Sequence, residues 1–139
     1  MSFLLDTCVI SEVVKPSPNP AVLAWLAAQE EASLFISVLT LGELRRGVER
    51  LPASRKREAL TAWLESELSA RFSGRILSID EAVAAQWGVM QARAERAGAR
   101  LPAIDSLIAA TAMAHHLTVV SRNIQDMEAS GVSLLNPWG

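Results

Sequence analysis

The sequence predicts an α/β domain built on a parallel sheet of four to five strands, with helices on both faces. Two observations predict this three-layer fold. Short apolar runs alternate along the chain with longer segments of helical period, which is typical of βαβ units. Several runs lead into a polar or acidic residue, as strands do at the carboxyl edge of such a sheet. Because the chain has 139 residues, half of them apolar, we expect a single domain over residues 1–139 with a substantial core.

Five short apolar runs are the predicted strands. Buried strands of a parallel sheet are typically continuous runs of this kind, and these runs are too short to be helices. The first run, Phe3-Leu4-Leu5, ends at Asp6. The other four strands are expected at residues 34–36, 76–79, 118–121 and 132–135.

Prolines and capping residues place the first three helices. A helix over residues 6–14 would end before Pro16, and Pro20 is suited to the first position of the second helix. Ser37 is expected to cap a third helix, because a serine side chain can accept a hydrogen bond from the first free backbone amides. That third helix carries Glu43.

Three more helices are expected in the second half of the chain. One covers residues 54–71, and Asp80 is expected to cap the next, which ends near Gly98. Pro102 would begin the last helix, which consists of small and apolar residues and runs to His116. Strands and helices therefore alternate along the whole chain.

Four acidic residues lie where this topology would bring them to one edge of the sheet. Asp6 ends the first strand, and Glu43 lies at the border of the apolar stripe of its helix. Asp105 lies in the first turn of its helix, and Asp126 follows the fourth strand. Ionised carboxylates beside apolar runs are costly unless they are compensated, and a divalent cation can compensate several at once. We therefore predict a Mg²⁺ or Mn²⁺ site, although each acid alone also fits a helix cap, a helix dipole or a boundary position.

A basic stretch follows Glu43, although the net charge of the chain is −2. It is offset only by Glu49 and consists of Arg45, Arg46, Arg50, Arg55, Lys56 and Arg57. Such a stretch is typical either of a patch for an anionic partner or of a solvated helix face with ion pairs. The pattern alone leaves both interpretations open.

The sequence carries no sign of secretion or of a membrane span. The N-terminal segment lacks the basic region of a signal peptide, and no apolar run is long enough to cross a bilayer. Because Cys8 is the only cysteine, a reducing cytoplasm is the expected location. We expect Cys8 to be a small core residue with a raised pKa. The His115-His116 pair is expected at a helix end and not as a metal site, since adjacent helical residues point in different directions.

Four motifs occur in order over nearly the whole chain. They are followed by the closing segment Leu134-Leu-Asn-Pro-Trp138 and read Leu4-Leu-Asp6-Thr7-Cys-Val-Ile, Leu39-Thr-Leu-Gly-Glu43-Leu, Leu101-Pro-Ala-Ile-Asp105-Ser-Leu-Ile-Ala-Ala and Val119-Val-Ser-Arg-Asn123-Ile-Gln-Asp126. Each motif is modest alone, but the set at these spacings resembles the PIN-domain family. It is most similar to the VapC/FitB branch, the toxin ribonucleases of bacterial type II toxin–antitoxin pairs.

This resemblance implies a Mg²⁺- or Mn²⁺-dependent endoribonuclease. It also implies a homodimer that is restrained by a cognate small DNA-binding antitoxin. The acidic positions of the family carry over directly to Asp6, Glu43 and Asp105, which are the expected metal ligands and catalytic residues. We expect the basic side chains Arg45, Arg46 and Arg50 to contact the RNA, together with Thr7 and Asn123. The apolar residues Val22, Trp25 and Leu26 give weak support to the homodimer.

The fourth acidic position does not carry over cleanly. Some family members have an aspartate directly after the arginine that follows the fourth strand, where this chain has Asn123. Asp126 lies three residues later, and Met127 replaces the usual aromatic residue after it. Either Asn123 or Asp126 fills the fourth position, and we expect Asp126 to be the catalytic one. The alternative is that Asp126 caps a short helix.

Two other enzyme classes with an acidic α/β pocket do not fit the motifs. A phosphoryl-accepting receiver domain would have an acidic pair at the first strand and a lysine after the last one, whereas Thr7 follows Asp6 and the only lysines are Lys15 and Lys56. A haloacid-type phosphatase would have Asp-x-Asp, and position 8 is Cys8. The remaining alternative is a catalytically silent RNA-binding or scaffold domain.

Overall fold

The computed structural model describes residues 1–139 and contains one sheet of five parallel strands. The strand order is β3-β2-β1-β4-β5. The strands are β1 (Phe3–Leu5), β2 (Leu34–Ser37), β3 (Ile76–Leu77), β4 (Thr118–Val120) and β5 (Leu134–Leu135). The predicted α/β fold with a parallel sheet is therefore confirmed, and each predicted strand is present.

Strand β1 occupies the centre of the sheet. Leu4 pairs in register with Phe35 of β2 on one side and with Val119 of β4 on the other. Because all neighbouring strands are parallel, their carboxyl ends lie along the same edge. Side chains that follow β1, β2 and β4 are therefore brought together.

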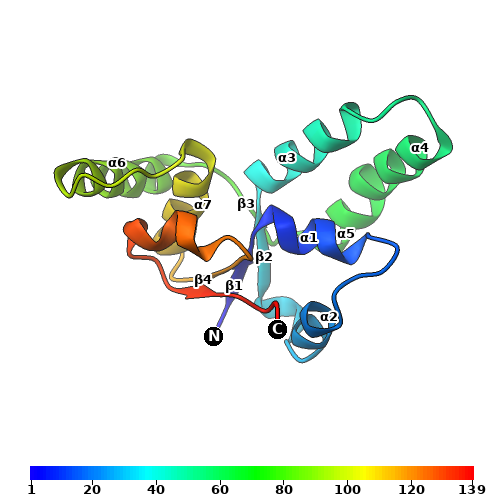
Figure 1. Ribbon diagram of the computed structural model, residues 1–139, viewed down its shortest axis with the longest axis horizontal. Helices are drawn as coiled ribbons and strands as arrows, with labels where there is room; N and C mark the ends of the chain where they lie inside the picture. Colours follow the sequence, from blue (N-terminus) through cyan, green and yellow to red (C-terminus); the bar gives the residue numbers. More distant parts are fainter.

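Helices cover both faces of the sheet (Figure 1). The regular helices are α1 (Thr7–Val13), α2 (Pro20–Ala27), α3 (Val38–Glu49), α4 (Arg55–Ala62), α5 (Ser69–Arg71), α6 (Glu81–Arg96) and α7 (Ala103–Ala114). Short 3-10 helices are η1 (Glu31–Ser33) and η3 (Ile124–Ser130), and η2 (Trp63–Leu68) is a π-helix. Figure 1 shows α6 and α7 on one side of the strands and α1, α3 and α4 on the other.

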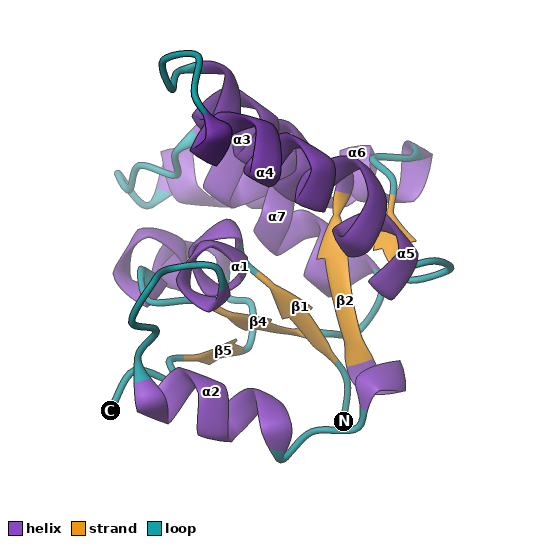
Figure 2. Ribbon diagram, turned by 90° about the vertical axis from the view of Figure 1, so that its right-hand side faces the viewer, coloured by secondary structure: helices purple, strands orange, loops and turns teal.

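Alternate residues of the strands enter two separate hydrophobic cores. Phe3 and Leu5 belong to the core that α1, α2, α3 and the α4–η2 segment close, whereas Leu4 belongs to the core under α6 and α7. In β4, Val120 belongs to the first of these cores and Val119 to the second. This alternation follows from the period of two along a strand. It confirms the three layers, and Figure 2 shows α3 and α4 at the top of the view and α2 at the bottom.

Helices α3 and α4 form an arm that extends from the body of the molecule (Figure 1). The helix predicted over residues 54–71 is present as α4, η2 and α5 in direct succession. Its middle turns are π-helical between Trp63 and Leu68, which the sequence pattern did not indicate. The buried side chains Leu64 and Leu68 anchor this segment on the first core.

Most predicted helix ends agree with the structure. Ser37 and Asp80 cap α3 and α6 with side-chain hydrogen bonds to the amides of Leu39 (3.0 Å) and Val83 (3.0 Å). Pro102 is the residue before α7 and not its first residue, which is a correction. The strands predicted at residues 76–79, 118–121 and 132–135 are shorter than expected.

Val22, Trp25 and Leu26 of α2 pack inward and do not form an exposed apolar surface. Val22 is fully buried, and Trp25 and Leu26 pack against the first core. Trp25 also meets Phe3 edge to face, with 4.9 Å between the ring centroids. These residues therefore give no support to the expected homodimer. No helix of the structure is both long and apolar enough to cross a membrane.

Candidate active site

Asp6 is held rigidly at the carboxyl end of β1. Its backbone amide donates to the carbonyl of Val120 in β4 (2.9 Å), which continues the sheet by one residue. One carboxylate oxygen accepts from the amide of Thr7 (2.9 Å), so that Asp6 caps α1. The helix cap, predicted as one explanation of this residue, is therefore real. Asp6 is buried, with only 6% of the residue exposed.

Ser121 holds the other oxygen of Asp6. Its hydroxyl donates a hydrogen bond of 2.7 Å to that oxygen and accepts one from the amide of Asn123 (3.0 Å). Ser121 is fully buried. Sequence reasoning missed this residue, although a serine directly after the apolar β4 run is a signal of the same kind as Asp6 after β1.

Glu43 reaches the site from the first half of α3. The Thr7 hydroxyl lies 2.5 Å from its carboxylate and 3.2 Å from the hydroxyl of the buried Thr40. Leu44 and Val48 are buried on the core side of the same helix. Glu43 itself is exposed. Its place at the border of the apolar stripe, which the helical period predicted, is confirmed.

Asp105 is the half-buried acid of the set. It lies in the first turn of α7, whose residues Ala109 and Ala112 are fully buried and allow close packing. Burial, and then the negative charges of Asp6, Asp126 and Glu43, raise the pKa of Asp105 from 3.8 to about 6. The structure therefore brings the other three predicted acids within electrostatic reach of Asp105.

Asp126 and Asn123 lie on the segment that follows β4. Asn123 precedes the 3-10 helix η3, and its side chain makes no capping bond. Asp126 is inside the first turn of η3, so the alternative that it caps a short helix is wrong. Both side chains are exposed. Met127 is fully buried in the second core.

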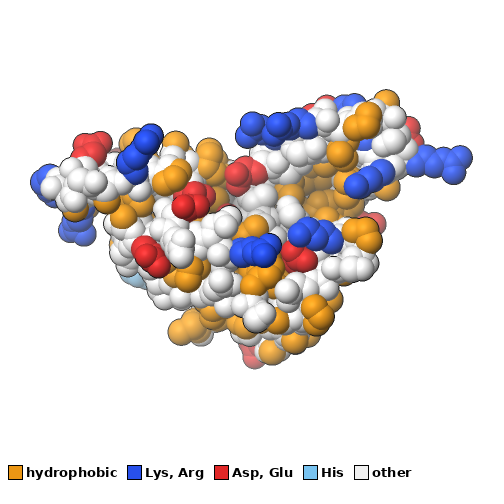
Figure 3. Space-filling model, in the orientation of Figure 1, with side chains coloured by type: hydrophobic (Ala, Val, Ile, Leu, Met, Phe, Trp, Pro, Cys, Tyr) orange, Lys and Arg blue, Asp and Glu red, His pale blue; other side chains and the backbone are white.

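The four carboxylates have no cationic partner within the protein. The salt bridges of the structure engage other acids, namely Glu12, Glu31, Glu49 and Glu65. No three of the acidic, histidine or cysteine side chains converge on one point as a preformed metal centre. In Figure 3, acidic side chains gather in the hollow between the arm and the α6 side of the molecule. Their donor atoms are all oxygen, which is the set that Mg²⁺ and Mn²⁺ prefer.

The predicted basic stretch divides into paired and unpaired side chains. Arg45 lies 3.0 Å from Glu65, and Arg57 lies 2.7 Å from Glu49. Arg46 on α3 and Arg50 at its C-terminal end are exposed and make no ion pair. Arg55 and Lys56, at the start of α4, are also exposed and unpaired. The interpretation as a helix face with ion pairs therefore holds for Arg45 and Arg57, and the patch for an anionic partner stays a prediction. Arg46 and Arg50 are the side chains on α3 that are free to meet an anion.

Cys8 lies beside the site and is not a pure core residue. Its Sγ is 3.8 Å from a carboxylate oxygen of Asp6, 3.5 Å from the Ser121 hydroxyl, and accepts from the amide of Arg122 (3.4 Å). The pKa of Cys8 is raised, as expected, chiefly by burial and less by Asp6. His115 and His116 lie at the end of α7, away from the acids, as predicted.

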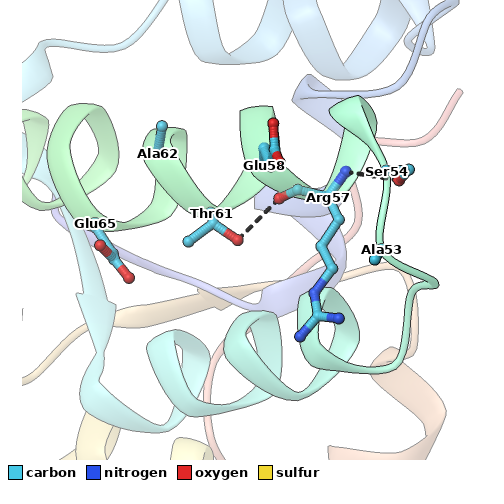
Figure 4. A pocket seen from close by; sticks show the side chains of 7 residues that line it. All are labelled: Ala53, Ser54, Arg57, Glu58, Thr61, Ala62 and Glu65. Atoms are coloured by element: carbon cyan, nitrogen blue, oxygen red, sulfur yellow. Dashed lines mark hydrogen bonds between the residues drawn. The ribbon is translucent and has the colours of Figure 1, made fainter.

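The hollow along the outer arm is separate from these acids. It has a volume of about 440 Å³, and its lining includes Ser54, Arg57, Thr61 and Glu65 (Figure 4). Thr61 donates to the backbone carbonyl of Arg57 (2.8 Å), and the Arg57 guanidinium is paired with Glu49. Most polar groups of this hollow are therefore engaged within the protein, and the acidic edge of the sheet is the better candidate site.

Two known proteins match nearly the whole length of this chain. A relative from Neisseria gonorrhoeae named Toxin FitB is 42% identical over 135 residues, which are 97% of both chains. A relative from Sinorhizobium fredii named VapC ribonuclease Y4jK is 38% identical over 135 residues, 97% of this chain and 96% of the relative.

Solved structures give the same result. The structure of FitAcB from Neisseria gonorrhoeae matches with a TM-score of 0.94 and 41% identity over 98% of both chains. The structure of FitAB bound to a DNA fragment matches with a TM-score of 0.93 and 39% identity over 99% of this chain and 96% of that one. The sequence pattern of the PIN domain matches residues 3–128. The chain therefore belongs to the PIN domain family and is similar over nearly its full length to proteins named VapC and FitB.

Proposed function

We propose that this protein is the toxin of a type II toxin–antitoxin pair and a metal-dependent endoribonuclease. The observation that carries the proposal is the set of four carboxylates without a cationic partner, whose mutual repulsion contributes to the raised pKa of Asp105. The names of its relatives support the same reaction. The residues proposed to act are Asp6, Glu43, Asp105 and Asp126.

A phosphodiester can enter a cluster of carboxylates only if a cation neutralises both partners. Mg²⁺, for which Mn²⁺ can substitute, lowers the pKa of an attacking water and stabilises the leaving oxygen when it is bound. The proposed direct ligands are Asp6 and Asp105, because both are short side chains held on rigid elements. The repulsion between them is then relieved by the ion, which is a reason for the protein to bind it.

Glu43 and Asp126 have less constrained places in the proposed site. The Thr7 hydroxyl fixes one oxygen of Glu43, which leaves the other free to hold a metal-bound or attacking water. Asp126 is exposed on η3 and adds negative charge at the rim. We propose that Asp126 acts through a second metal or a water. A cation that already faces the carboxylates of Asp6, Glu43 and Asp105 attracts a fourth carboxylate less strongly than it attracts the first three.

The RNA is proposed to be held by neutral and cationic groups around the acids. Thr7 and Asn123 lie next to Asp6 in the hydrogen-bond network of the site. Arg46 and Arg50 are free to contact flanking phosphates, while Arg45 would first have to leave Glu65. These contacts orient the backbone without reading its sequence.

The proposed partner is a small DNA-binding antitoxin that covers the acidic site. The FitAB structure, which is bound to DNA, supports a complex of this kind. We propose a homodimer within that complex and a cytoplasmic location, since RNA is the substrate. A monomer in sedimentation at micromolar concentration would contradict the homodimer without affecting the proposed reaction.

The proposed reaction is tested with purified protein and a structured RNA. Cleavage should require Mg²⁺ or Mn²⁺, stop when EDTA is added and resume when excess metal is restored. Full activity in EDTA contradicts the metal mechanism. RNA binding without cleavage in any of these metals would instead indicate a silent RNA-binding domain.

A further inference from the structure

A groove runs from the acidic site along the inner side of the arm, between α1 and the α3–α4 pair. Its inner part is a cavity of about 160 Å³ that begins at Glu43. Its outer part is a wider hollow of about 510 Å³. The two parts adjoin each other, because Ser11, Val14 and Leu60 line both of them. We name this feature the α1–α3 groove.

The inner part of the α1–α3 groove is apolar and has an aromatic wall. Most of its lining is hydrophobic, and Leu44 and Val48 form its buried floor. Trp63 is half-buried and contributes its ring. Figure 3 shows recessed hydrophobic side chains beneath the arm, bordered by Lys or Arg side chains.

The outer part of the groove is cationic. Lys15 and Lys56, the only lysines of the chain, both line it. Lys56 is exposed without an ion pair, and Lys15 is half-exposed beside Glu12 (2.8 Å). The groove therefore has a carboxylate at its inner end, an apolar and aromatic middle, and positive charge at its mouth.

This order of chemistry matches a nucleotide chain. Unstacked bases bind proteins through apolar and aromatic contacts, while Lys and Arg side chains contact the phosphates between them. The inner cavity is smaller than the roughly 300–1,000 Å³ of pockets for drug-sized ligands, so it suits one ring system and not a larger molecule. A phosphate held at the acidic site would place its neighbouring base at the Glu43 end of this cavity.

We propose that the α1–α3 groove binds one unstacked nucleobase of the RNA, with the following phosphate at Lys56. This proposal rests on the proposed ribonuclease function and deepens it, because it assigns a base subsite next to the bond that is cut. Trp63 supplies the stacking surface, and Val14 closes the opposite side. The subsite gives the enzyme a preference for substrates whose bases can leave a stack, such as loops and single strands.

Two glycines of α3 allow a matched test. Gly47 lines the inner cavity, and a Cβ atom added there would meet nothing within 4 Å. Gly42 has the same freedom but lines a different hollow, beside Arg45 and Leu64. Leucine favours a helix at either position. Gly47→Leu would therefore fill the proposed base subsite, while Gly42→Leu is its control.

The experiment measures cleavage and binding of a labelled single-stranded oligoribonucleotide. Binding is measured by anisotropy with Ca²⁺ in place of Mg²⁺, so that a divalent cation can neutralise the acids while binding is followed separately from cleavage. We expect Gly47→Leu to weaken binding and raise KM by about fivefold or more, with Gly42→Leu close to wild type. An oligoribonucleotide with one abasic position should lose affinity for wild type and lose less for Gly47→Leu.

The outcomes separate this proposal from the proposed function. If wild-type protein binds RNA but does not cleave it, the proposed ribonuclease function is wrong. The base subsite is then decided by comparing RNA binding by Gly47→Leu and Gly42→Leu. Equal RNA binding by both leucine variants overturns the base subsite even if cleavage is normal. Unchanged RNA binding with loss of antitoxin binding in Gly47→Leu would assign the groove to a protein segment and would also overturn it.

Discussion

The Ser121 hydroxyl donates a hydrogen bond of 2.7 Å to the Asp6 carboxylate, from 115 positions further along the chain. Both side chains are buried. The same hydroxyl accepts from the amide of Asn123 (3.0 Å), so one serine joins the ends of β1 and β4 to the turn that leads to Asp126. The orientation of the proposed metal ligand Asp6 therefore depends on this serine.

Replacing Ser121 should weaken metal binding more than it changes the chemical step. Ser121→Ala leaves one oxygen of Asp6 and the amide of Asn123 without their partner, which should lower the free energy of unfolding by about 1–2 kcal/mol. We expect the Mg²⁺ concentration for half-maximal cleavage to rise several-fold. Ser133→Ala is the control, because Ser133 pairs with Thr118 at the other end of β4 (3.1 Å). An unchanged Mg²⁺ requirement in Ser121→Ala would show that Asp6 is positioned without it.

Asp105 should make the stability of the metal-free protein depend on pH. Its pKa in the folded protein is about 6, above its ordinary value of 3.8. Ionisation of Asp105 therefore costs the folded state nothing below pH 4, an increasing amount between pH 4 and 6, and a constant amount above that range.

Asp105→Asn should remove this cost. Because the side chain is partly exposed, we expect the variant to be more stable than wild type by roughly 1 kcal/mol at pH 7.5 and to match it near pH 4. Urea unfolding in EDTA measures both values. Excess Mg²⁺ should stabilise wild type more than the variant. A stability difference that is the same at both pH values would contradict the repulsion among the acids.

The unpaired arginines of α3 should contribute more to RNA binding than the paired one. The double variant Arg46→Ala, Arg50→Ala should weaken RNA binding and reduce the slope of log affinity against log salt by about 1–2. Arg45→Ala should have a smaller effect, because Arg45 is engaged by Glu65 (3.0 Å). Equal slopes in wild type and in the double variant would mean that this face is a solvated surface or an antitoxin contact.

Asp126 should have a partial and metal-dependent effect. We expect Asp126→Asn to reduce cleavage at low Mg²⁺ and to regain most of its rate at high Mg²⁺, since a lost charge weakens ion binding without removing the other acids. Asn123→Ala should disturb the turn with little change in the Mg²⁺ requirement. A Mg²⁺ titration of cleavage rates compares them. An Asp126→Asn variant that equals wild type at every concentration would leave Asp126 with a structural role only.

The fold and the positions of the four acids could be predicted because they depend on local patterns. Short apolar runs fixed the strands, and capping residues such as Ser37 and Asp80 fixed helix starts within one residue. In a parallel sheet these strand ends meet at one edge, so Asp6 and the segment after β4 could be placed together without coordinates.

Features that depend on distant contacts could not be predicted. The hydrogen bond between Ser121 and Asp6 joins residues 115 positions apart. No local pattern distinguishes Ser121 from other serines at strand ends. The pairing of Arg45 with Glu65 likewise depends on how α3 packs against η2. Val22, Trp25 and Leu26 of α2 were expected to be available for a dimer interface. Instead Val22 is fully buried in the first core, and Trp25 and Leu26 pack against it.

The most direct test of the metal-dependent site is the cleavage rate of Asp6→Asn and Asp105→Asn under saturating Mg²⁺. Each change removes ligand charge and preserves the size of the side chain. Circular dichroism should first show that both variants keep the native fold. We predict that each variant then loses cleavage almost completely, by about a thousandfold or more, while it still binds RNA. Cleavage at the wild-type rate by either folded variant would contradict the proposed acidic metal site.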